Sequence, residues 1–153
     1  MHKEIIETWQ IHNRINSYLL DTIENENYLN DLSTAKGRNV RNQFMHMHNV
    51  RLMWIKEALP ELLPNLEKLE DDNLSIEKLK INIIASGIAI EKLLKFGLEN
   101  NRIKGFKPHP TAFLGYLISH ESHHRGQIVL ILKECGHSIS KKAGFGLWQW
   151  GTR

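Results

Sequence analysis

Apolar residues at helical spacing run through most of this sequence. Four long segments carry the pattern, at about residues 4–30, 39–59, 75–99 and 111–135. In the first segment the apolar positions recur about every four residues, the period of one face of an amphipathic α-helix. These positions are Ile5, Trp9, Ile15, Leu19 and Ile23. Because no segment of note alternates apolar and polar residues as a strand does, the sequence predicts an all-α protein, a four-helix bundle.

Turn-forming residues separate the four segments. Pro60 ends the second helix, since proline disfavours helical geometry in the residue before it. Residues 60–73 then form a long crossover between the second and third helices. Ser75 is suited to cap the third helix, and Gly136 to follow the end of the fourth. The third helix takes its apolar pattern from Ile81, Ile84, Ile88, Leu93 and Leu94.

Residues 137–153 follow neither a helical nor a clear strand pattern. This tail contains Trp148 and Trp150, so we expect an irregular, Trp-rich C-terminal tail that folds back on the bundle or contacts a partner. A chain of 153 residues, of which 41% are hydrophobic, fits a single domain of residues 1–153 with a substantial core.

Charge and hydropathy exclude several classes of partner. The 20 basic residues are scattered among 17 acidic ones and are not interleaved with aromatic residues, which argues against nucleic-acid binding. The apolar runs are shorter than the ~20 residues that span a bilayer, and the N-terminus lacks the apolar stretch of a signal peptide. Cys135 is the only cysteine and cannot form an internal disulfide. We therefore expect a cytoplasmic protein without a membrane or nucleic-acid partner.

The histidines indicate the chemistry. His120 and His124 are four residues apart on the predicted fourth helix, so both project from one face, which also carries Leu117 and Ile128. A buried imidazole without a partner costs about 1–3 kcal/mol, so this pair needs either hydrogen bonds or a metal.

The second helix adds His46 and His48 in an apolar setting. Three facing imidazoles suit zinc, nickel, iron or copper and leave a coordination position open. Helical periodicity alone places His48 closer to the core than His46.

On the fourth helix, residues 120–124 also fit the H-E-x-x-H pattern of zinc metalloproteases, with Glu121 as the base. That class is disfavoured, because the extended pattern needs a histidine where the chain has Leu130, and no strand is evident to hold a peptide. Glu121 follows His120 directly, so it should point away from the site as a solvated or salt-bridged acid.

Five neighbouring residues complete the predicted surroundings. We expect a close helix contact at Gly126. His123 should be a surface or subunit-contact residue. Arg125 and Gln127 should be solvated, with orienting acidic groups or capping a neighbouring loop as the alternative. His12, on the inner face of the first helix, should be a hydrogen-bonded core residue rather than a group beside the metal.

Two motifs resemble the signature regions of the DinB/YfiT-like family. They are Val40-Arg41-Asn42-Gln43-Phe44-Met45-His46-Met47, and His120-x-x-x-His124 followed by Arg125-Gly126-Gln127-Ile128. The resemblance covers nearly the whole chain in helix order, crossover length and motif position. It implies that a second-helix histidine followed by a large apolar residue joins the H-x-x-x-H pair as a metal ligand. The implied ligands are His46, His120 and His124, with His48 as the alternative to His46.

The resemblance also implies a function. Members of such a family would use one divalent transition metal per chain, here zinc or nickel, with iron or manganese as further options. Our first hypothesis is a metal-dependent thiol S-transferase that activates a low-molecular-weight thiol toward a small-molecule electrophile. The alternatives are a metal-dependent hydrolase, or a stress-response or interaction protein that binds a metal without catalysis. No catalytic side chain is identified, and we expect a homodimer.

Overall fold

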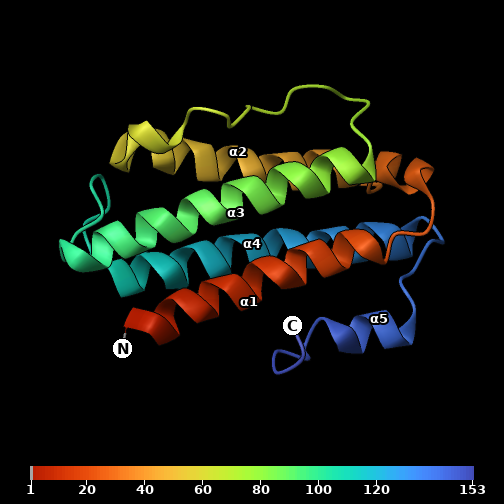
Figure 1. The fold of residues 1–153 in the computed structure, drawn as a ribbon. Helices are drawn as coiled ribbons and strands as arrows, with labels where there is room; N and C mark the ends of the chain where they lie inside the picture. Colours follow the sequence, from red (N-terminus) through yellow and green to blue (C-terminus); the bar gives the residue numbers. More distant parts are fainter. Residues whose placement is uncertain (1) are drawn as a thin grey trace.

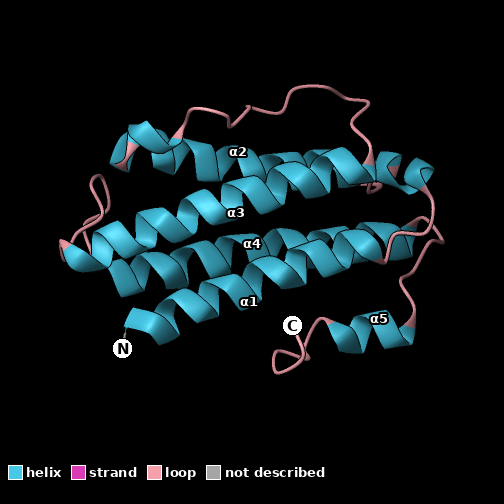
Figure 2. Cartoon of the chain, viewed as in Figure 1, coloured by secondary structure: helices cyan, strands magenta, loops and turns pink. Residues whose placement is uncertain are grey.

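The computed structural model describes residues 2–153 as a bundle of four long helices (Figure 1). They are α1 (His2–Asp21), α2 (Val40–Ala58), α3 (Ile76–Glu99) and α4 (Pro110–Glu134). Shorter helical segments are the 3₁₀ helices η1 (Glu26–Asn30) and η2 (Pro60–Leu62), and helix α5 (Lys141–Gly146). No strand forms within residues 2–153 (Figure 2). The predicted all-α four-helix bundle is therefore confirmed.

The crossover between α2 and α3 determines the topology. After η2 the chain runs back along α2 to the end of the bundle where α2 begins, so α2 and α3 point the same way (Figure 1). Helices α1 and α2 each pack against both α3 and α4, and α3 also contacts α4. The long crossover predicted from the sequence is thus present.

Side-chain caps fix the predicted helix starts. Asn39 accepts a hydrogen bond from the backbone N–H of Asn42 at the start of α2, and Ser75 accepts one from Lys78 at the start of α3. Gly136 follows α4 with φ +80°, a left-handed conformation that favours glycine. Local sequence therefore determines these boundaries.

The first helix is shorter than predicted. It ends at Asp21, and the chain turns before Asn25 caps η1. The apolar pattern continues because Ile23 and Leu29 are still buried, although the backbone around them is no longer α-helical. Periodicity alone could not distinguish a continuing α-helix from a buried segment whose backbone is not α-helical.

The prediction of an irregular tail was wrong for residues 141–146, which form α5. Ser140 caps this helix by accepting a hydrogen bond from the backbone N–H of Ala143 at 3.0 Å. Gly146 packs directly against the phenol of Tyr18, so that a Cβ atom there would overlap it. Helix α5 is too short to show a helical period, and its two glycines disfavour helix, so the sequence did not predict it. Beyond α5, Trp148 is 82% exposed.

The core consists of two apolar clusters, one toward each end of the bundle. One contains Leu19, Phe44, Ile83 and Ile128, and the other contains Trp9, Ile55, Leu93, Phe113 and Leu117. On each of the four long helices, buried polar residues lie in sequence between the residues of one apolar cluster and those of the other. They include His12, Asn16, His48, Arg51, Ser86, Glu121 and His124.

The apolar residues of α3 are not all buried, and the long helices differ from membrane-spanning ones. Ile81, Ile84 and Ile88, which supplied part of the helical pattern of α3, are exposed on its outer side. None of the helices formed by residues 2–153 combines the length and apolarity needed to cross a membrane.

Candidate metal centre

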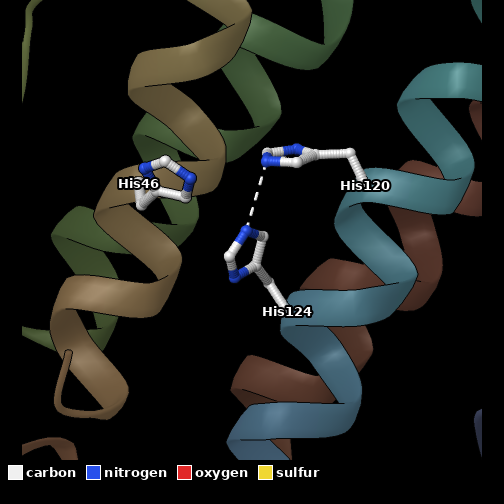
Figure 3. A group of neighbouring side chains, drawn as sticks. All are labelled: His46, His120 and His124. Carbon is white, nitrogen blue, oxygen red and sulfur yellow. Dashed lines mark hydrogen bonds between the residues drawn. The ribbon is translucent and has the colours of Figure 1, made fainter. Parts of the chain in front are cut away.

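Three histidines from two helices face one another between α2 and α4 (Figure 3). His46 comes from α2, and His120 and His124 come from successive turns of α4. Each offers a ring nitrogen, and these nitrogens lie within 4.8 Å of one another. We call these three residues the His₃ cluster. Such a group could hold a metal ion.

His48 does not belong to the His₃ cluster. It is fully buried, as periodicity indicated, but its Nε2 lies 2.7 Å from the backbone oxygen of Glu67 and its Nδ1 lies 3.0 Å from Ser86 Oγ. Because the carbonyl accepts only, Nε2–H donates to it and Nδ1 accepts from the serine hydroxyl. Both ring nitrogens are therefore used in the core.

Two glutamines orient His124. Its Nδ1 lies 2.7 Å from Oε1 of Gln43 and 2.9 Å from Oε1 of Gln127, so Nδ1 carries the proton and donates it to these oxygens. The lone pair on Nε2 then points into the cluster. The prediction that Gln127 is solvated was wrong, and Gln43 was not singled out. A signal existed, since each glutamine lies three residues from a cluster histidine on the same helix.

The spacing of His120 and His124 fits a shared ion. Their Nε2 atoms are 3.2 Å apart. Two nitrogens at the usual ~2.0–2.1 Å from a tetrahedral metal would be about 3.3 Å apart. Two lone pairs at this distance repel each other unless a proton or a metal lies between them. His120 Nδ1 is also buried without a hydrogen-bond partner among the described residues, so no hydrogen bond on that side orients the ring.

All three histidines are held in the neutral form that binds metals. Burial lowers the pKa of His124 to about 4, with the neighbouring rings of His120 and His46 contributing. Burial also lowers the pKa values of His46 and His120, and the guanidinium of Arg38 lowers both further. Protons therefore compete little with a cation at neutral pH.

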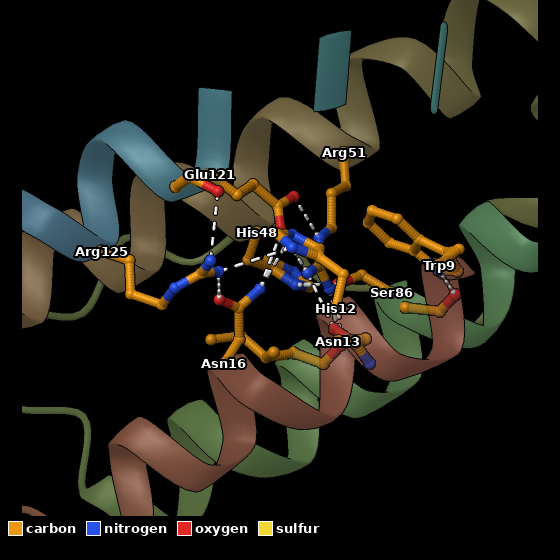
Figure 4. A network of polar contacts seen from close by, with 12 residues as sticks. Trp9, His12, Asn13, Asn16, His48, Arg51, Ser86, Glu121 and Arg125 are labelled. Carbon is orange, nitrogen blue, oxygen red and sulfur yellow. Dashed lines mark hydrogen bonds and ion pairs between the residues drawn. The ribbon is translucent and has the colours of Figure 1, made fainter. Parts of the chain in front are cut away.

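Behind the cluster, a buried polar network joins all four long helices (Figure 4). At its centre Glu121, 1% exposed, accepts hydrogen bonds from Arg51 at 2.6 and 2.8 Å, from Asn16 at 2.9 Å and from His12 at 3.0 Å. Burial alone would raise the pKa of Glu121, but the charge and hydrogen bonds of Arg51 hold it far below its ordinary value.

The network decides three sequence-based expectations. Glu121 is salt-bridged, which is one of the two roles expected for it. Both of its carboxylate oxygens already accept hydrogen bonds from Arg51, Asn16 or His12, so it cannot act as the base of an H-E-x-x-H protease. His12 is a hydrogen-bonded core residue, as expected. Arg125 is not simply solvated, because it donates to Asn16 Oδ1 at 2.7 Å.

The outer face of α4 also differs from prediction at one position. A Cβ atom at Gly126 would meet nothing within 4 Å, so the expected close helix contact is absent. His123 is exposed on the same face, as expected.

An aromatic group borders the cluster toward the start of α4. The ring of Tyr116 is stacked 6.4 Å from that of His120, and it also contacts Trp54, Phe106 and Phe113. Trp54 Nε1 is buried without a hydrogen-bond partner in residues 2–153. These residues lie on α2, α4 and the loop before α4, and sequence spacing alone does not connect positions so far apart.

The fold and the cluster together define a helical bundle of the kind that builds metal sites from side chains on facing helices. Residues 1–141 match the sequence profile of the DinB family. The chain therefore belongs to the DinB family, as its two motifs suggested. No curated protein and no solved structure matches it.

Proposed function

We propose that this protein is a metal-dependent enzyme of the thiol S-transferase type. The observation that carries the proposal is the His₃ cluster, which offers three neutral nitrogen ligands and no carboxylate. His46 and His120 are only half-buried, so a ligand from solvent can reach the site. Zinc or nickel suits such a ligand set, with iron or manganese as alternatives.

The residues around the cluster favour an anionic ligand. When bound, a divalent metal would lower the pKa of a coordinated thiol or water toward neutrality. Three neutral imidazoles leave the full charge of a dication uncompensated, and Arg38 adds a positive charge nearby. Glu121, the adjacent carboxylate, is already neutralised by Arg51. A thiolate therefore gains more here than a neutral ligand would.

Hydrolysis needs a neighbouring side chain that acts as a general base on water, whereas thiol transfer does not. Glu121 cannot take a proton from water at the cluster, because its oxygens are bonded to other donors. A thiol that loses its proton to solvent on binding is already a nucleophile. The aromatic group beside His120 offers an apolar surface for an electrophile.

The test uses zinc- or nickel-loaded protein with a small thiol and 1-chloro-2,4-dinitrobenzene. The thiolate sulfur forms a bond to the ring carbon, chloride leaves with the electrons of the broken C–Cl bond, and the thiol proton goes to solvent. We expect turnover that is lost in His120→Ala and kept in His123→Ala, an exposed histidine on the same helix. Tight metal binding without turnover of any thiol and electrophile would instead favour a non-catalytic metal-binding protein.

A further inference from the structure

A cavity of about 380 Å³ opens on the side of α2 next to His46. Its lining includes Asn42, Met45 and His46 of α2, and Arg38 just before α2. Glu70 and Asp72 of the crossover also line it, and we call this side the crossover wall. The volume is within the usual range for small-molecule sites. Because His46 belongs both to this cavity and to the His₃ cluster, the two sites are separated by a single imidazole.

The crossover wall is held in place by Asn49. Its Oδ1 accepts from the backbone N–H of Leu69 at 2.8 Å, and its Nδ2 donates to the backbone oxygen of the same residue at 2.9 Å. Leu69 is itself buried. The acidic residues that follow it are therefore presented at a fixed position relative to α2.

The cavity carries one unpaired charge of each sign. Arg38 makes no ion pair or side-chain hydrogen bond with any residue that the structure describes, and the same holds for Asp72 within residues 2–153. Glu70 differs, since it pairs with Lys68 at 2.9 Å. Arg38 lines the cavity together with the cluster residue His46. The positive charge is thus on the side of the cluster.

We propose that this cavity binds the substituents of the thiol whose sulfur binds at the His₃ cluster, and that this thiol carries both a carboxylate and an ammonium group, as cysteine does. Arg38 donates to the carboxylate, and Asp72 accepts from the ammonium. This inference rests on the proposed function, because the sulfur must bind beside His46 for its substituents to reach the cavity. It adds the chemical class of the thiol.

The test measures thiol binding to cobalt(II)-loaded protein by the thiolate-to-cobalt charge-transfer absorption. The probes are L-cysteine, its methyl ester, N-acetyl-L-cysteine and the N-acetyl methyl ester, which remove the carboxylate charge, the ammonium charge or both. We expect each charge to strengthen binding by about two- to fivefold, the usual range for partly exposed ion pairs.

Matched variants assign each charge to its residue. Arg38→Gln should abolish the advantage of cysteine over its methyl ester and leave the advantage over N-acetylcysteine. Asp72→Asn should do the reverse. Lys36→Gln and Glu61→Gln, which remove exposed charges outside the cavity, should change every affinity by less than about twofold.

The outcomes separate the two proposals. No charge-transfer absorption with any of the four thiols would overturn the thiol-binding function itself. Absorption with all four at equal affinity would leave that function standing and overturn the cavity assignment. A preference for cysteine that survives both Arg38→Gln and Asp72→Asn would also overturn it, since the amine would then be binding the cobalt directly.

Discussion

Replacing Glu121 by glutamine should strongly destabilise the protein, although the side chain keeps its shape. All the hydrogen-bond partners of this carboxylate, namely Arg51, Asn16 and His12, approach it as donors. An amide NH₂ in place of either oxygen would face a donor at 2.6–3.0 Å and lose those bonds. Arg51, which is fully buried, would also lose its counter-charge. Breaking a buried pair in this way costs about 3–5 kcal/mol.

The assay is urea unfolding of the metal-free protein, followed by helical circular dichroism in the presence of a chelator. Lys95→Gln is the matched control, because it breaks an exposed pair with Glu91 at 2.7 Å and should cost about 0.5 kcal/mol or less. The expected loss for Glu121→Gln is a large fraction of the ~5–15 kcal/mol typical of a domain. A loss below about 1 kcal/mol would refute the argument that this ion pair is buried and fully satisfied.

Three further predictions concern the cluster and its helix. The free energy of unfolding of the metal-free protein should fall as pH drops from 6.5 toward about 4, because the unfolded histidines take up protons there while buried ones such as His124 do not; a urea midpoint that is constant across this window would contradict the lowered pKa values. Gln43→Ala should weaken zinc affinity by roughly 10- to 100-fold in a competition titration, since Gln43 orients His124, and unchanged affinity would mean that Gln127 is sufficient. Gly126→Ala should stabilise the protein by about 0.5–1 kcal/mol in thermal unfolding; destabilisation would indicate that a second copy covers this face, as in the expected homodimer.

The fold could be predicted because its determinants are local. Asn39, Ser75 and Gly136 mark helix ends by their own chemistry, and the apolar period marks the helices between them. The pattern failed where the chain stays buried after leaving the helix, as at Leu29, and where a helix is too short to show a period, as in α5. Such cases are decided by tertiary packing.

The site was only partly accessible from sequence. Periodicity pointed to His48 because α2 is buried on several sides, against α3, α4 and the crossover, so that no single inward stripe exists. The motif resemblance was needed to single out His46. The Glu121–Arg51 pair joins residues seventy positions apart, and each residue alone looks like an ordinary charged surface residue. Pairings of this kind depend on the fold and not on local spacing.

The most direct test of the central claim is the metal content of untagged protein, purified without chelator, beside His46→Ala, His48→Ala and His120→Ala variants that retain their helical circular dichroism. We expect about one zinc or nickel ion per chain in the unsubstituted protein and in His48→Ala, and loss of the metal in the other two variants. An unsubstituted protein that bound neither zinc nor nickel after reconstitution would contradict the assignment of the His₃ cluster as a metal site, as would a His46→Ala variant that retained the metal while His48→Ala lost it.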